Sequence, residues 1–226
     1  MKLFHSDDYF LDINPYRKYG LVRDRVRDSN MQVELREPEL ASEEDILRVH
    51  TKQYLDAIRT GKPHDLAFSP LWFWSDGLLN AVLNTNGGCI SAAYAALEDR
   101  VAGNIASGFH HASQESGEQL CVFNGPAVAI KRLQSDGRIS KGMVIDTDVH
   151  YGNGTANIFY DDPTVFTLSF AGISWDRRPN TRTNILVNLR KGMGGTEYFR
   201  KLLEFIPSVL QSFRPDLVVY HSGADP

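Results

Sequence analysis

Residues 142–155 read GMVIDTDVHYGNGT, and the fold class follows from this stretch. Its apolar start at residues 142–145 predicts a short buried strand, and polar residues begin at Asp146, where that strand ends. Residues two apart in an extended segment point to the same side, so Asp148 and His150 face one way while their neighbours turn into the fold. A carboxylate and an imidazole placed in this way form a two-point chelate for a metal ion.

Helical and strand patterns alternate outward from this segment. The predicted helices cover residues 42–58, 88–97, 126–133, 155–160 and 195–213, the last of them interrupted near Pro207. The predicted strands cover residues 101–106, 142–145, 164–170, 185–189 and 216–220. Strands separated by helices of this length imply an α/β fold. We expect three layers, with a parallel sheet in the middle and helices on both of its faces. No linker or repeat interrupts the pattern, so we expect one domain over residues 1–226.

The helix at residues 42–58 has start and stop signals as well as a periodic pattern. Ser42 with Asp45 resembles a capping box, and the segment Gly61-Lys62-Pro63 ends the helix. The apolar residues that recur on one face are Leu47, Tyr54, Leu55 and Ile58.

The composition excludes several classes of protein. With 226 residues, 42% of them apolar, and a net charge of −4, the chain is neither disordered nor collagen-like. The charge gives no whole-chain reason to bind nucleic acid or an anionic membrane, and no apolar run approaches the ~20 residues that span a bilayer. Residues 1–10 are too charged for a signal peptide, so we expect a soluble, cytoplasmic protein. Cys89 and Cys121 lack the spacing of a zinc ribbon or redox pair and are expected to be buried thiols.

Polar clusters follow three of the predicted strands. Tandem histidines stand at residues 110–111, a second cluster covers residues 146–150, and Asp225 follows the last strand. Ligand sites of parallel α/β sheets lie beyond the carboxyl ends of the strands, so the three clusters can converge on one crevice. Asp225 is the most natural third ligand beside Asp148 and His150, and two carboxylates with one imidazole leave room for water and a substrate oxygen.

Each cluster taken alone has another interpretation. An Asp-x-Asp at a strand end also begins a magnesium phosphohydrolase site of the haloacid-dehalogenase type, but that site needs a lysine and a later acidic pair and leaves the histidines unexplained. Adjacent histidines can be hydrogen-bonding residues at the entry to a helix, and acidic residues end many strands. The combination of the three clusters favours a metal-dependent hydrolase.

The same clusters resemble motifs of the histone deacetylase family of the arginase/deacetylase superfamily. Residues 108–112, GFHHA, followed by Cys121 and Asn124, resemble the tandem-histidine segment, and residues 144–155 resemble the metal-binding segment. Residues 218–225, VVYHSGAD, are similar to the strand that brings the last metal ligand. Further similar segments are Leu47-Arg48-Val49-His50, Tyr54-Leu55 and Gly87-Gly88. The resemblance extends from about Ser42 to Pro226.

The resemblance implies a role for each site residue. Asp148, His150 and Asp225 would hold a divalent metal, usually zinc, with iron(II) or cobalt also suited to two carboxylates. His111 would be the general base and acid, oriented by Asn153, and His110 would assist electrostatically, oriented by Asp146. The reaction would be hydrolysis of the amide of an acylated lysine peptide or a small acylated amine. A structural K⁺ would lie beside the metal, reached through Asp146, Asp148, His150 and Ser169.

Departures from the family pattern bear on the substrate. Leu120, in Gln119-Leu120-Cys121, stands where the family has an aromatic residue in the wall of the acyl tunnel. After Phe170, the family has a longer aromatic loop, whereas this chain has Ala171-Gly172-Ile173-Ser174-Trp175. Leu120 and Phe170 are the candidate substrate-binding residues. Tyr151 replaces a histidine that often follows the metal ligand.

The family's catalytic tyrosine, a donor to the oxyanion, lies in a glycine-rich segment beyond the last ligand, and residues 1–226 contain no such segment. Losing one oxyanion donor commonly costs about 10²–10³ in turnover. We therefore expect either the C-terminally truncated part of a longer enzyme or a deacetylase-like module that binds acylated ligands without turnover. Nothing in the sequence indicates the oligomeric state.

Overall fold

A computed structural model describes residues 1–9, 17–69, 74–223 and 225 of the chain. The elements, in chain order, are β1 (Lys2–Phe4), the 3₁₀ helix η1 (Asp7–Tyr9), α1 (Arg17–Arg27), β2 (Glu34–Arg36), α2 (Glu43–Leu47), α3 (Lys52–Thr60), α4 (His64–Ala67), α5 (Leu78–Asp99), β3 (Ala102–Asn104), α6 (Gly125–Ser135), β4 (Gly142–Asp146), α7 (Asn153–Ile158), β5 (Val165–Ala171), β6 (Asn184–Asn188), α8 (Gly195–Phe213) and β7 (Leu217–His221). No helix among the described residues has the length and apolar character needed to cross a bilayer.

The strands are parallel and form two sheets, where the sequence suggested one. The four-stranded sheet has the order β6-β5-β4-β7 and the three-stranded sheet has the order β2-β1-β3. Asp146 at the end of β4 is the register partner of His221 on β7 and of Ser169 on β5. The predicted α/β class with parallel strands is confirmed, and the tandem histidines follow a strand of the smaller sheet.

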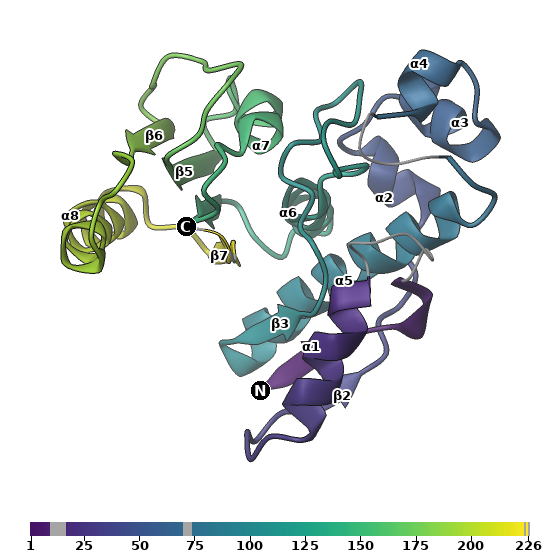
Figure 1. Cartoon of the computed structure of the whole chain (residues 1–226), viewed down its shortest axis with the longest axis horizontal. Coiled ribbons are helices and arrows are strands. Elements are labelled where there is room, and N and C mark those ends of the chain that lie inside the picture. The colour runs from purple at the N-terminus through teal and green to yellow at the C-terminus, as the bar shows by residue number, and fades with distance from the viewer. Residues whose placement is uncertain (10–16, 70–73, 224, 226) are drawn as a thin grey trace.

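The four-stranded sheet is covered on both faces. Figure 1 shows α8 on one side of this sheet and α6 and α7 on the other. Met143 and Ile145 belong to the core cluster that α8 covers, whereas Val144 between them belongs to the core cluster that includes α6. This alternation places Asp146 on the same face as Val144, because residues two apart share a face. The side chain of Asp146, at the end of β4, therefore lies on the face of the sheet that α6 and α7 cover.

Residues 42–58 form two helices, so the prediction of one continuous helix was wrong. The capping box is present, with the Asp45 amide donating to Ser42 Oγ at 3.1 Å, but α2 ends at Leu47. The Thr51 hydroxyl then caps α3 by accepting from the Tyr54 amide at 3.3 Å. A new cap inside the segment turns the chain, and Leu47 is consequently exposed rather than part of the buried face.

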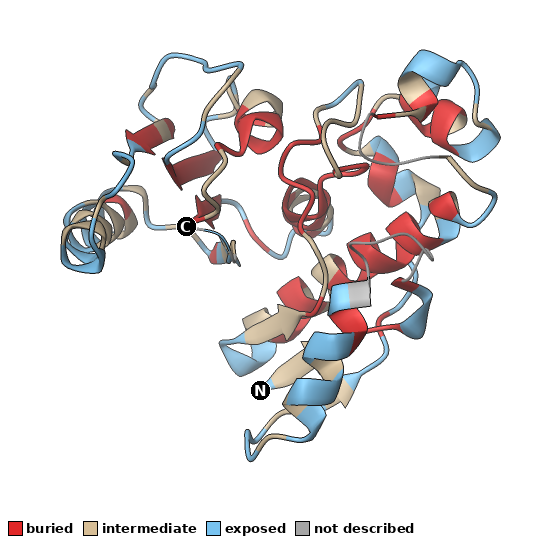
Figure 2. Ribbon diagram, viewed as in Figure 1, coloured by how far each residue is buried: buried red, intermediate tan, exposed pale blue. Residues whose placement is uncertain are grey.

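Two other helices differ from the prediction. Helix α5 begins ten residues before the predicted start at 88, because the apolar and small residues from Leu78 onward are buried against neighbouring elements. Helix α8 continues through Pro207 without the expected interruption. Pro207 and Leu203, whose carbonyl loses its partner, lie on the exposed face, so water can bind that carbonyl. Figure 2 shows exposed residues on the side of α8 that faces away from the sheet, whereas β5 is buried.

Candidate metal centre

The three predicted metal ligands lie together beyond the ends of β4 and β7. One ligand atom from each of Asp148, His150 and Asp225 lies within 4.8 Å of the others. The Nδ1 atom of His150 is 2.9 Å from Oδ1 of Asp148 and 3.4 Å from Oδ2 of Asp225. The donor set of two carboxylate oxygens and one imidazole nitrogen fits a divalent ion such as zinc.

Local backbone structure holds these ligands in place. The backbone amide of His150 donates to Asp148 Oδ1 at 2.9 Å, and the amide of Val149 donates to Asp225 Oδ1 at 3.2 Å. Burial raises the pKa of Asp148, but the hydrogen bonds from His150 and the charge of His110 together outweigh it, so the pKa is lowered on balance. The carboxylate is thus ionised and ready to bind a cation near neutral pH.

Gly223 allows the two ligand segments to approach each other. A Cβ atom at this position would lie 2.3 Å from the Cα atom of Asp148. A backbone atom cannot move out of the way as the end of a side chain can, so any larger residue at 223 would separate Asp148 from Asp225.

His110 forms a buried pair with Asp146. Its Nδ1 atom lies 2.7 Å from Asp146 Oδ2, and both side chains are buried. Burial lowers the pKa of His110, but the Asp146 carboxylate outweighs burial and raises it overall. Conversely, burial raises the pKa of Asp146, while the imidazoles of His110 and His221 lower it on balance. An ionised Asp146 can only accept a hydrogen bond, so Nδ1 of His110 carries the proton between them.

His111 forms a separate pair with Asn153, the first residue of α7. The Nδ1 atom of His111 is 2.6 Å from Asn153 Oδ1, and the ring lies T-shaped to His150 with centroids 6.0 Å apart. Burial, followed by the charge of His110, lowers the pKa of His111 to about 4. The ring is therefore neutral near pH 7, and it lies beside the metal ligands.

Glu118 and Trp175 complete the surroundings of His111, and neither was among the predicted site residues. The Asn153 amide nitrogen donates to Glu118 Oε2 at 2.6 Å, and the Trp175 indole donates to Glu118 Oε1 at 2.6 Å. The Trp175 ring lies 4.9 Å from the ring of His111. These contacts join residues 35 and 57 positions apart, so no local pattern in the sequence could have indicated them.

Turns on both sides of the tandem histidines position them. Phe109 has a φ of 58°, in the left-handed region, and the Ala112 amide donates back to its carbonyl at 3.1 Å. The Thr155 amide of α7 donates to the His110 carbonyl at 3.0 Å. Gly154 permits this contact, since a Cβ atom there would lie 2.4 Å from the carbonyl oxygen of Ala112. The histidine segment is thus packed directly against the N-terminus of α7.

Phe170 does not reach the site. Its side chain is fully buried in the core cluster under α8 and packs edge-on against Phe205 at 6.3 Å. It follows Ser169, which pairs with Asp146, and neighbouring residues of a strand face opposite sides. The expected substrate-binding role of Phe170 is therefore wrong. Leu120 is half-buried in the loop before Cys121, which leaves its predicted role in the acyl tunnel untested.

Ser169 faces the site side of the sheet. Its Oγ atom is buried and has no hydrogen-bond partner among the described residues. A cavity of about 10 Å³, lined by Asp146, Gly152, Ser169 and neighbouring residues, lies beside it. That volume is close to the size of a single water molecule or small ion.

Both cysteines are free thiols. Cys121 is buried as expected, while Cys89 on α5 is half-buried and accepts a weak hydrogen bond from Asn104 at 3.4 Å. Burial raises the pKa of Cys89 to about 11 and that of Cys121 to about 12. Neither thiol is a nucleophile near neutral pH.

The chain is similar to proteins that carry a histone deacetylase domain. The model of that domain family matches residues 13–226. Histone deacetylase 2 of Arabidopsis thaliana is 33% identical over 199 residues, which cover 84% of this chain and 51% of that protein. A probable deacetylase of Methanothermobacter thermautotrophicus is 29% identical in an alignment 251 residues long, which covers 100% of this chain and 74% of that protein. A protein of Picosynechococcus sp. described as uncharacterized is 37% identical over 152 residues, 67% of this chain and 51% of that protein. The chain thus spans about half the length of two of these relatives.

Proposed function

The chain belongs to the histone deacetylase family, and from this premise we propose that it performs metal-dependent hydrolysis of the amide bond of an acylated lysine or a similar amine. The observation that carries the proposal is the juxtaposition of two groups of residues. The ligand set of Asp148, His150 and Asp225 lies beside the His111 ring, whose free nitrogen is available as a base.

Zinc is the proposed ion for this ligand set, and iron(II) or cobalt would also suit two carboxylates and an imidazole. When bound, zinc polarises an amide carbonyl and acidifies a water molecule. The three protein ligands leave coordination positions free for these two groups, as catalytic sites require. Asp148 and Asp225 would contribute carboxylate oxygens to the ion, and His150 would contribute an imidazole nitrogen.

His111 is the proposed general base and then the general acid. The side-chain nitrogen Nδ2 of Asn153 donates to Glu118, so Oδ1 faces His111 and accepts a hydrogen bond from its Nδ1–H. The lone pair of the neutral ring is consequently on Nε2, which can take a proton from water and return it to the leaving amine. His110, held by Asp146, would supply positive charge beside the same position.

We extend the proposal to a structural K⁺ at the cavity beside Asp146. The unpartnered Oγ of Ser169 and the Asp146 carboxylate support it, because a hard monovalent cation prefers oxygen donors. Leu120 would contribute one wall of the acyl tunnel, and a leucine there gives a less aromatic wall that favours no particular acyl group.

The test is hydrolysis of an acetyl-lysine peptide by the purified, zinc-loaded protein, measured as acetate released. We expect turnover to fall by about 10²–10⁴ in His111→Ala, since general-base catalysis contributes that much. The matched control is His64→Ala, because His64 is exposed and distant in the fold, on α4. Turnover that is unchanged in His111→Ala would contradict the assignment of the base. Peptide binding without turnover in the unmodified protein would contradict hydrolysis by residues 1–226.

A further inference from the structure

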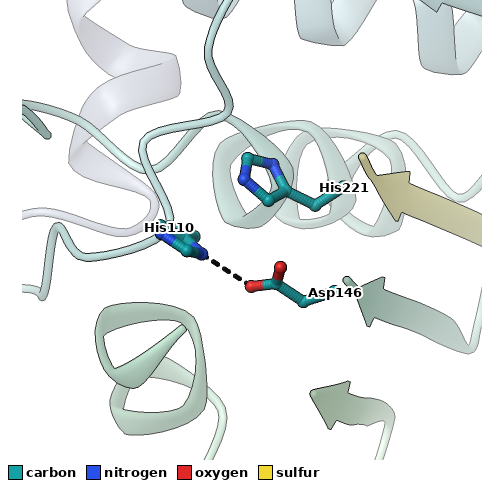
Figure 3. Close-up of side chains that lie close together, drawn as sticks. All are labelled: His110, Asp146 and His221. Atoms are coloured by element: carbon teal, nitrogen blue, oxygen red, sulfur yellow. Dashed lines mark hydrogen bonds and ion pairs between the residues drawn. The ribbon is translucent and has the colours of Figure 1, made fainter. Parts of the chain in front are cut away.

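His221 has no role in the proposed hydrolysis, although it lies beside His110 and Asp146. It is the last residue of β7 and the register partner of Asp146 on β4, so the two side chains emerge next to each other on one face of the sheet. His110 reaches the same place from the loop after β3, with its ring centroid 4.6 Å from that of His221 (Figure 3). One nitrogen or oxygen of each of the three residues lies within 4.8 Å of the others.

We propose that His110, Asp146 and His221 form a second divalent-metal site, suited to Zn²⁺ and separate from the site of Asp148, His150 and Asp225. Two imidazole nitrogens and a carboxylate oxygen are common zinc donors. His110 is 6% exposed and Asp146 is 3% exposed, so an ion bound there would be shielded from water. No ligand of the first site is shared with the second.

Two glycines leave space around this cluster. A Cβ atom at Gly108 would lie 2.5 Å from His221 Nδ1, and one at Gly152 would lie 2.4 Å from Asp146 Oδ2. Both residues therefore leave the donor atoms uncovered on the sides from which the backbone approaches. Zinc–nitrogen bonds of about 2.0–2.1 Å allow two ligand atoms to be at most about 4.2 Å apart, so binding would draw the donors slightly together.

An ion at this site would compete with the His110–Asp146 hydrogen bond. That bond, 2.7 Å between Nδ1 and Oδ2, holds a proton where the metal needs a lone pair. In a neutral ring the proton moves from Nδ1 to Nε2 when the metal takes the Nδ1 lone pair, and in a charged ring one proton passes to solvent. Either change removes the orientation of His110 by Asp146, so in the proposed hydrolysis, on which this consequence rests, the second ion would be inhibitory.

The experiment counts bound ions. Metal-free protein is dialysed against graded Zn²⁺, and bound zinc is measured by mass spectrometry. We expect two ions in the unmodified protein, one in His221→Gln and one in Asp148→Ala. His64→Gln, which removes an exposed histidine outside the cluster, is the control and keeps two ions.

Three results would overturn the proposal. These are saturation of the unmodified protein at one ion, an equal second ion in His221→Gln, and loss of the second ion in His64→Gln, which would identify surface binding. If His221→Gln loses its circular dichroism spectrum, nitrogen-15 NMR of the unmodified protein decides the question. The second equivalent of zinc must then shift the ring nitrogens of His221 and His110, and unshifted resonances contradict the site. Because neither readout uses turnover, failure of the proposed hydrolysis would leave this result unaffected.

Discussion

His111 and Asn153 are joined by a hydrogen bond of 2.6 Å from ring Nδ1 to amide Oδ1, and the far side of the same amide is bound to Glu118. The Glu118 carboxylate accepts from Asn153 Nδ2, which fixes which end of the amide faces the imidazole. The negative charge of Glu118 therefore lies one side chain away from the base. A neutral partner in contact with His111 is consistent with a pKa that burial lowers to about 4.

Moving that charge next to the imidazole should raise the pKa of His111. In the double variant Asn153→Asp/Glu118→Gln the net charge is conserved, and the amide introduced at position 118 can donate to the carboxylate introduced at position 153. A carboxylate in contact with the ring favours the imidazolium, so the pKa rises from about 4 toward neutrality. The acidic limb of the rate profile then moves to higher pH, and the ring NMR titration of zinc-loaded protein moves in the same direction.

The single variant Asn153→Asp is the informative comparison. It places a carboxylate against Glu118, where the present contact is 2.6 Å, and two carboxylates at that distance share a proton. Its effect on His111 should be smaller than that of the double variant. A larger effect in the single variant would mean that Glu118 does not contact position 153.

Gly223→Ala should weaken metal binding without removing a ligand. The new Cβ atom would lie 2.3 Å from the Cα of Asp148, so the segments that carry Asp148 and Asp225 must separate. We expect zinc affinity to fall by at least about tenfold, which corresponds to about 1.4 kcal/mol. The control is Gly195→Ala at the start of α8, where nothing lies within 4 Å of a new Cβ atom. Equal affinities in competition with a chelator would contradict the packing of Gly223 on Asp148.

Removal of the metal ion that Asp148 helps to bind should lower the thermal stability of the protein. A ligand that binds the folded state alone stabilises it by about 4 kcal/mol at a concentration about 1,000 times its dissociation constant. Chelator treatment should thus lower the Tm of the unmodified protein by more than it lowers the Tm of Asp148→Ala, in which only the second site can still hold an ion. Asp161→Ala, which removes an exposed carboxylate, should behave as the unmodified protein does. A chelator effect of equal size in Asp148→Ala would place the stabilising ion elsewhere.

Stability should fall in weak acid because of His50. Burial lowers the pKa of His50 to about 4 from 6.5, and its Nε2 accepts a hydrogen bond from the backbone amide of Asn124 at 3.0 Å. Below pH 6.5 the unfolded chain binds a proton that folded His50 does not, so the free energy of unfolding decreases as pH falls toward 4. One such group contributes a slope of at most about 1.4 kcal/mol per pH unit.

Denaturant unfolding between pH 4 and 7 measures this slope. We expect His50→Gln to have a shallower slope than the unmodified protein by about one proton, although it is less stable at pH 7 because the ring packs against Phe123. His111 has a lowered pKa too, so some slope remains. His64→Gln should keep the full slope, and an unchanged slope in His50→Gln would contradict the assignment.

The sequence alone determined the features that depend on neighbouring residues. The apolar run at residues 142–145 predicted β4, because alternation along a strand is a local property. Asp148 and His150 follow the strand in a bend, and their ligand atoms lie together there. The same rule applied to β5 places Phe170 opposite Ser169, so its exclusion from the site could have been predicted.

Only the tertiary structure decided which residues meet across the fold. Nothing local links Glu118 to Asn153 and Trp175, since loop closure over 35 and 57 residues brings them together. Likewise, His221 lies beside Asp146 because β4 and β7 pair in one particular register. A slip of one residue in that register would turn His221 to the opposite face from Asp146, since side chains alternate with a period of two. Register follows from the packing of α6, α8 and their cores on the two faces of the sheet, which is a property of the whole chain.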